Sequence, residues 1–171
     1  MKKGSIKIIL FSILLILMSC STMQYNINKN NKFTEKHISN LLQKNGNVFY
    51  LFSTYSTFSI VWTYNKNGIE IYRLAKGKVF RKEIFSEKEW IQDVKISVED
   101  INNELYKTCS VVLDGDGFGF KINIDGIIHE DRFAIDIDCM KQQTYKSDFL
   151  NKIVYDIKTC KMWGVYAGQT H

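Results

Sequence analysis

The segment "DGDGFGFKINID", residues 114–125, carries aspartates at a spacing that suggests a calcium loop. Four of its residues occupy positions one, three, six and twelve of an EF-hand calcium loop: Asp114, Asp116, Gly119 and Asp125. Position five is Phe118, where calcium loops carry a polar oxygen, and residues 118–124 alternate apolar and polar side chains as a β-strand does. A hairpin turn is therefore the favoured interpretation, and a weak exposed metal contact at Asp114 and Asp116 stays open.

Histidine is the next candidate for chemistry, because it titrates near neutral pH. His129 lies in "HEDR" beside Glu130 and Asp131, where a charged turn is favoured over a general base. The sequence has no G-x-S-x-G motif, no phosphate-cradling glycine loop and no CxxC pair. We therefore expect no enzymatic activity and no cofactor, with an envelope hydrolase that uses His129 as an alternative.

The N-terminal twenty residues have the layout of a secretory signal. Three lysines precede residues 8–18, which are apolar except for Ser12. Eleven residues of helix span roughly 16 Å, and a bilayer core needs about 20 apolar residues, so a permanent membrane-spanning helix is disfavoured.

The stretch Leu17-Met18-Ser19-Cys20 resembles a bacterial lipobox, although Met18 stands where a smaller residue is usual. The resemblance covers the first twenty residues only. In that family, signal peptidase II cuts before the cysteine, which is acylated on its sulfur and its amine. It implies a lipid anchor at Cys20. Because Ser21 is not the aspartate that favours inner-membrane retention in enteric lipoproteins, we expect the periplasmic side of the outer membrane.

These features predict three parts: a signal peptide over residues 1–19, a lipidated flexible tether over residues 20–33, and one domain over residues 34–171. The remaining chain is long enough for a single core. The formal net charge of +5 falls once the three N-terminal lysines are removed, so it does not indicate nucleic-acid binding.

Hydrophobic periodicity predicts an α+β fold, with an antiparallel sheet of hairpins and helices packed on one face. Helices are expected from Thr34 to Asn45, from Ser86, over 98–106, and from Ser147 with an apolar stripe that ends at Cys160. Strands are expected at 58–64, 69–74, 78–85, 110–113, 118–124, 133–139 and 161–166, with tight turns at Asn67-Gly68, Lys76-Gly77 and Asp125-Gly126.

Charge is polarised along the chain. Residues 114–138 hold seven acidic side chains against two basic ones, and residues 66–82 hold six basic against one acidic. Two solvated faces would explain this, and so would two patches that steer a charged partner or rest near anionic lipid. The candidate partner surface comprises Asp114, Asp116, Asp136, Asp138, Lys76, Lys78, Arg81 and Lys82.

Three cysteines follow Cys20, and an envelope location permits a disulfide between two of them. If Cys109 and Cys139 lie at opposite ends of a three-strand meander, the last helix brings Cys160 back to the level of Cys109. This topology predicts a Cys109–Cys160 bridge and leaves Cys139 as a buried thiol; three reduced cysteines are the alternative.

The leading functional hypothesis is a lipid-anchored, non-enzymatic module that binds a protein in the cell envelope. One version is an immunity or inhibitor protein that neutralises a toxin or hydrolase there. A small-ligand or cation-binding lipoprotein is the second hypothesis, with Asp114, Asp116 and Asp138 as candidate oxygens. The membrane is an expected partner through the lipid, and nucleic acid is not.

Overall fold

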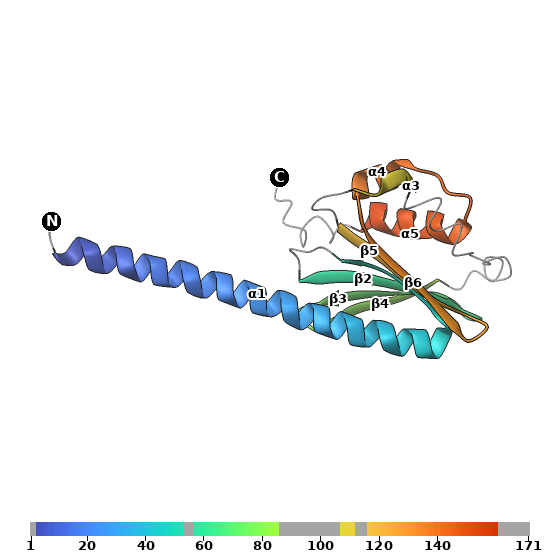
Figure 1. Cartoon of the computed structure of the whole chain (residues 1–171), viewed down its shortest axis with the longest axis horizontal. Helices are drawn as coiled ribbons and strands as arrows, with labels where there is room; N and C mark the ends of the chain where they lie inside the picture. The colour runs from blue at the N-terminus through green and yellow to red at the C-terminus, as the bar shows by residue number, and fades with distance from the viewer. Residues whose placement is uncertain (1–2, 53–56, 86–106, 112–115, 161–171) are drawn as a thin grey trace.

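The computed structural model describes residues 3–52, 57–85, 107–111 and 116–160, and Figure 1 shows their arrangement. One six-stranded antiparallel sheet forms the centre of the molecule, so the predicted α+β class is confirmed. The elements in chain order are α1 (Lys3–Asn45), β1 (Asn47–Phe52), β2 (Phe58–Asn65), β3 (Gly68–Ala75), β4 (Lys78–Phe85), α3 (Lys107–Cys109), β5 (Asp116–Ile124), β6 (Ile127–Ile135), α4 (Ile137–Gln142) and α5 (Asp148–Thr159).

The strand order is β4-β3-β2-β1-β5-β6, so β1 lies at the centre and pairs with both β2 and β5. The strands predicted at 58–64, 69–74, 78–85 and 118–124 are confirmed. Two of the tight turns place successive residues at positive φ: Lys76 with Gly77, and Asp125 with Gly126. Such pairs suit the twist of a hairpin, and glycine occupies the second position of each.

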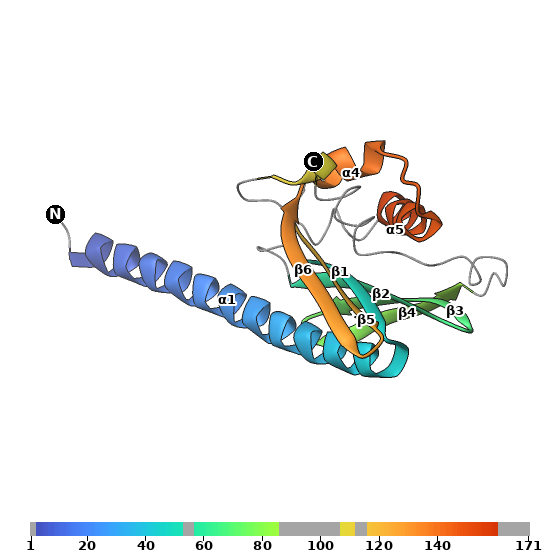
Figure 2. The same ribbon diagram turned by 45° about the vertical axis from the view of Figure 1, so that its right-hand side comes forward.

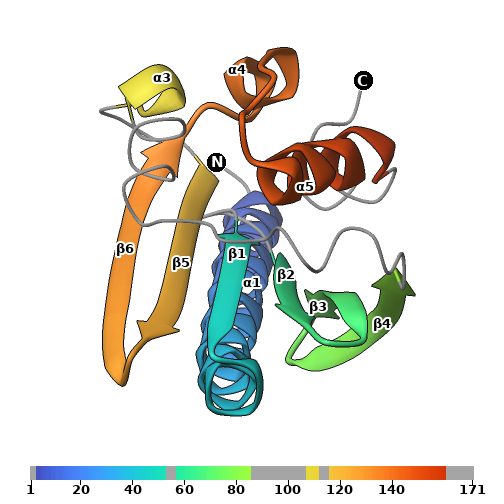
Figure 3. The ribbon, with the colours of Figure 1, turned by 90° about the vertical axis from the view of Figure 1, so that its right-hand side faces the viewer.

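Helices cover both faces of the sheet, not one. Figure 3 shows α3, α4 and α5 on one side, while α1 runs across the other. On the α5 side, the apolar stripe of α5 packs on a continuous cluster that includes Phe49, Phe58, Trp62, Phe118 and Phe120. On the α1 side, a smaller cluster joins Ile38 and Leu41 to Val48, Tyr50, Phe52, Val61, Tyr72 and Leu74.

The flexible tether predicted for residues 20–33 is wrong. Helix α1 is continuous from Lys3 to Asn45, and Figure 2 shows its first half extending beyond the sheet. Ile27 and Asn30 are buried against the domain, and the Asn30 side chain donates to Ser59 Oγ (3.1 Å) and accepts from the Gly77 amide (3.2 Å). These tertiary contacts stabilise a helix in an asparagine-rich segment with poor intrinsic propensity.

The predicted end of this helix at Asn45-Gly46 is confirmed, with Gly46 at φ +74°. Among the residues that the structure describes, no helix is both long enough and apolar enough to cross a membrane.

The segment after Phe133 also departs from expectation. Strand β6 ends at Ile135, and Asp136 begins a helix, because its carboxylate accepts hydrogen bonds from the amides of Asp138 and Cys139. The "HEDR" residues lie within β6 rather than in a turn. Cys109 ends helix α3, and Ser110 forms only an isolated bridge to Ile135. The helices predicted from Ser86 and over 98–106, and the strand predicted at 161–166, lie outside the described residues.

The predicted Cys109–Cys160 disulfide is wrong: Cys109 pairs with Cys139, with Cα atoms 5.6 Å apart, and Cys160 is a free cysteine. The three-strand meander assumed for the prediction does not exist, because Ser110 and Val111 pair with β6 and not with β5, and β6 stops before Cys139. The Asp136 amide donates to the Cys109 carbonyl (2.9 Å), which holds α3 against the start of α4. Both cysteines therefore lie at the same end of β6.

The last helix agrees with its sequence pattern. Ser147 caps α5 by accepting from the Leu150 amide. Its predicted apolar stripe is buried at Phe149, Leu150, Ile153, Val154 and Ile157, and Cys160 follows at the C-cap.

Candidate functional site

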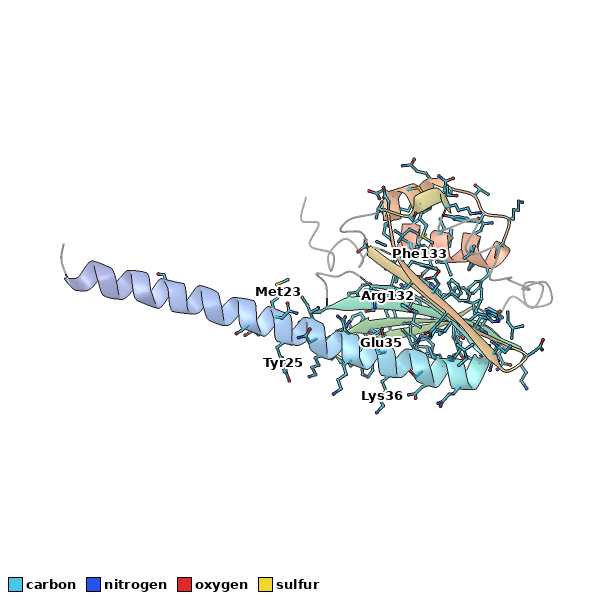
Figure 4. The ribbon with its side chains drawn as sticks, in the orientation of Figure 1. Met23, Tyr25, Glu35, Lys36, Arg132 and Phe133 are labelled. Atoms are coloured by element: carbon cyan, nitrogen blue, oxygen red, sulfur yellow. A yellow bond between two sulfur atoms is a disulfide. The ribbon has the colours of Figure 1, made fainter. Side chains whose placement is uncertain are left out.

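A groove of about 260 Å³ lies between α1 and the β5–β6 hairpin. Figure 4 labels Glu35 on α1 and Arg132 on β6, which come from its two sides. Strands β1 and β5 run between these two elements. The lining side chains are Glu35, Tyr50, Lys121, Glu130, Asp131 and Arg132.

Glycine on β5 makes room for the aromatic floor beside this groove. A Cβ on Gly119 would lie 2.3 Å from Cζ of Tyr50, and a Cβ on Gly117 would lie 2.2 Å from Cζ of Phe52. Only glycine therefore allows these two rings of β1 to lie on β5. The Arg132 guanidinium stacks over the Phe52 ring, 3.8 Å from its centroid.

The charges of the groove are unevenly satisfied. Lys121 Nζ lies 2.6 Å from Glu130 Oε2, and Asp131 accepts from the Arg132 amide at 2.7 Å. Within the described part of the chain, the Glu35 carboxylate makes no ion pair or side-chain hydrogen bond. Glu35 is thus an exposed carboxylate at the wall of the groove. The lysine of the groove, Lys121, is paired with Glu130.

Tyr50 remains protonated at neutral pH. Burial raises its pKa to about 12, and the negative charge of Glu35 adds to this effect. Its hydroxyl can donate a hydrogen bond but cannot act as a base. A neutral phenol and a carboxylate that is exposed and unpaired within the described residues are groups that can bind a cation or an amide.

Strand β6 borders the groove and lies at one end of the strand order. In the described chain, its outer edge meets only the bridge at Ser110 and a hydrogen bond from the Val111 amide to the Ala134 carbonyl. The preceding part of β6 offers backbone groups to an added strand, which is a common mode of peptide binding.

The structure separates the predicted partner residues into two sets on opposite edges of the sheet. Lys78, Arg81 and Lys82 lie on β4, with Lys76 in the preceding turn. Two of them are engaged, because Arg81 pairs with Glu83 (3.0 Å) and Lys82 with Glu70 (3.4 Å).

The acidic set lies near the other edge and is largely structural. Asp116 begins β5, Asp136 caps α4, and Asp138 pairs with Lys141 (3.0 Å) in the same helix. Asp114 lies outside the described residues.

The EF-hand interpretation of residues 114–125 is contradicted by β5. A nine-residue strand separates Asp116 from Asp125 by roughly 30 Å, so one ion cannot reach both. In the described chain, no group of three or more His, Cys, Asp or Glu side chains is placed to hold a metal. His129 lies in mid-strand on β6, opposite Ile122 of β5.

The sequence singled out none of the six groove residues as a site residue, although Glu130 and Asp131 were noted as neighbours of His129. One signal was available, because Glu35 is the only acidic residue in the first 69 positions. No signal linked it to Glu130, since that proximity depends on β5 pairing with β1.

No protein-family model matches the chain, and neither a curated protein nor a solved structure is significantly similar to it. What the molecule does must therefore be inferred from its own groove, edges and charges.

Proposed function

We propose that this chain is a lipid-anchored cell-envelope protein that binds another protein without catalysing a reaction. The observation that carries the proposal is the Glu35 carboxylate, which is unpaired among the described residues, in a groove bordered by an edge of β6 that no described strand covers along most of its length. In its most specific version, the partner is a toxin or hydrolase of the envelope, and this chain acts as an immunity or inhibitor protein.

A partner strand alongside β6 would explain the shape of the site. Its alternate side chains would point toward α1, and a lysine or arginine among them would meet Glu35 and Glu130. The groove is smaller than the roughly 300 Å³ at which pockets for small organic molecules begin, which favours one protein side chain over a free ligand. Exposed Ile127 and Ile128 at the start of β6 add apolar contact area.

The anchor places this surface close to the membrane. Ile27 is the first buried apolar residue among those of α1 whose burial the structure describes, and it lies seven positions after Cys20, a helical rise of roughly 10 Å. If Cys20 carries lipid, the domain is held at the bilayer surface by a short helix.

Capture of the partner from membranes tests the binding site. The intact lipoprotein is purified from membranes after cross-linking, as wild type, as Glu35→Gln, and as Gln43→Lys. The control lies at an exposed position of the same helix outside the groove and makes the same change of charge. We expect wild type and control to recover the same protein and Glu35→Gln to recover about tenfold less. Recovery of no partner at any salt concentration, or equal recovery by all three, would contradict the proposal.

A separate measurement tests the anchor. Cys20→Ala should abolish palmitate labelling and leave uncut precursor, because the acylated atoms belong to that residue. Unchanged labelling and membrane partition in the variant would refute lipidation at Cys20.

A further inference from the structure

The side of α1 that faces away from the sheet is a basic stripe. Tyr25, Lys29, Lys32 and Lys36 are spaced by four, three and four residues, so they share one helix face. All four are exposed, and Figure 4 shows Tyr25 and Lys36 projecting away from the sheet. The opposite side of the helix is buried through Ile27, Asn30, Thr34, Ile38 and Leu41.

The neighbouring hairpin extends this stripe. The Gly77 amide donates to Asn30, and a Cβ on Gly77 would lie 3.1 Å from carbons of the Lys29 side chain. The turn therefore places Lys76 and Lys78 close to Lys29. Together these residues form what we call the basic face: Tyr25, Lys29, Lys32, Lys36, Lys76 and Lys78.

In the part of the chain that the structure describes, Glu70 lies under α1 but is buried and paired with Lys44 and Lys82. The other acidic side chains near α1 lie to the side of this face or across the sheet from it. Residues 20–34 contain no acidic residue. Glu35 points into the groove toward β6, and Glu130 is paired there with Lys121. Asp136 and Asp138 belong to α4, in the layer on the other side of the sheet.

We propose that the basic face lies on anionic lipid headgroups, with α1 along the membrane surface and the α5 layer directed away from it. The inference rests on the proposed lipid anchor, because Cys20 lies in the same continuous helix, five residues before Tyr25. A helix with lysines and an aromatic ring on one side is suited to the headgroup region, where tyrosine is enriched and each lysine is attracted by anionic lipid. This orientation leaves the groove and the edge of β6 accessible from the side.

Lysine footprinting on vesicles tests this orientation. The intact protein is reconstituted on vesicles of pure phosphatidylcholine, or with 30% phosphatidylglycerol, and acylated with a water-soluble reagent before peptide mass spectrometry. We expect Lys29, Lys32 and Lys36 to react several-fold more slowly on the anionic vesicles, and Lys158 on α5 to react equally on both. The protection should disappear at about 0.5 M salt, where the Debye length is only a few ångströms.

A triple variant identifies the residues responsible. Lys29→Gln/Lys32→Gln/Lys36→Gln should remove the protection of Lys76 and Lys78, since each lysine contributes about fivefold to anionic binding. Lys146→Gln/Lys152→Gln/Lys158→Gln makes the same charge change in the α5 layer. This control should leave the protection of Lys76 and Lys78 unchanged. Equal reactivity on both vesicle types overturns the proposal. Protection that follows protein concentration instead of lipid charge also overturns it, because a second copy would then cover the face. The intact mass of the unreacted protein shows separately whether Cys20 carries lipid. A protein without the lipid anchor is therefore distinguished from a lipidated protein whose basic face does not bind anionic lipid.

Discussion

The two faces of the sheet are stabilised by different kinds of contact. The α5 face is packed with aromatic and aliphatic side chains and carries the disulfide between α3 and α4. The α1 face has a smaller apolar cluster and buries a row of amides and hydroxyls: Asn30, Thr34, Asn47, Ser59 and Thr63. The α5 face thus provides most of the apolar burial, while polar contacts under α1 fix the position of a helix that borders the candidate site.

A buried ion pair reinforces the α5 face. The Asp156 carboxylate of α5 accepts from two nitrogens of Arg73 on β3, and the Trp62 indole donates to it at 3.0 Å. Arg73 also reaches Glu83 on β4 at 3.2 Å. Arg73 and Trp62 therefore share the Asp156 carboxylate, and Arg73 has Glu83 as a second acidic partner.

The polar row of the α1 face is a network of single hydrogen bonds. Thr63 donates to the Asn47 carbonyl at 2.7 Å, and Asn45 donates to Thr63 at 3.1 Å. Further along, Tyr72 donates to Glu70, and the charges of Lys44 and Lys82 surround that carboxylate.

Asp156→Ala should have the largest effect on stability. It leaves the Arg73 charge and the Trp62 N–H buried with fewer partners, and removal of one member of a buried pair typically costs about 3–5 kcal/mol. Urea unfolding followed by circular dichroism measures the loss. The double variant Arg73→Met/Asp156→Leu is the control, because it removes both charges and should recover most of the stability. A loss below about 1 kcal/mol in the single variant would show that the pair does not hold α5.

Removal of the disulfide should come next. Cys109→Ser/Cys139→Ser removes the cross-link between two residues 30 apart in sequence. Because the unfolded chain then gains conformational entropy, the free energy of unfolding should fall by about 3–4 kcal/mol. Cys160→Ser should change stability by less than about 1 kcal/mol and serves as the control. Non-reducing peptide mapping should recover Cys109 joined to Cys139, and a bridge to Cys160 would contradict the structure.

Gly119→Ala should have an intermediate effect, at the boundary of the groove. The added methyl would overlap the Tyr50 ring, and overpacking of this kind costs about 1–3 kcal/mol. In the double variant Tyr50→Ala/Gly119→Ala, the ring that the added methyl would overlap is absent. The destabilisation caused by this overlap should therefore disappear. A double-mutant cycle of unfolding free energies measures this coupling. Simple additivity of the two substitutions would show that the ring does not depend on the glycine.

The smallest expected effect is a pH dependence on the α1 face. Burial, with a contribution from the Lys82 charge, lowers the pKa of His37 below 6.5, and its Nε2 has no hydrogen-bond partner. The unfolded chain therefore binds a proton more readily, so stability is fully present above pH 6.5 and declines as pH falls toward the folded pKa.

His37→Phe should remove this slope and keep the edge contact with Tyr72, where the ring centroids are 4.7 Å apart. Urea unfolding between pH 7 and pH 5 measures the slope. His129→Gln, on β6, is the control and should retain it. An unchanged slope in His37→Phe would mean that another group titrates in this range.

The local elements could be read from the sequence because their signals are short-range. Alternation over 118–124, the Asp125-Gly126 turn and the Ser147 cap each depend on residues within a few positions, and all three are confirmed. The end of β6 was misplaced because the alternation continues past Ile135, while Asp136 satisfies the amides of a helix instead. The alternating pattern thus predicts the strand correctly up to Ile135, where the Asp136 cap begins a helix.

The arrangement in space was decided by tertiary structure. The sequence determined the strands from β2 to β5, the hairpin turns and the amphipathic last helix, because each follows from period, turn chemistry or capping. It did not predict the central strand β1 or the bounds of β6. It did not determine that β5 pairs with β1, that α1 runs unbroken through Asn30, or that Cys109 meets Cys139. Strand pairing and helix docking depend on which apolar faces bury one another across tens of residues, and the groove between Glu35 and Arg132 exists only after that choice has been made.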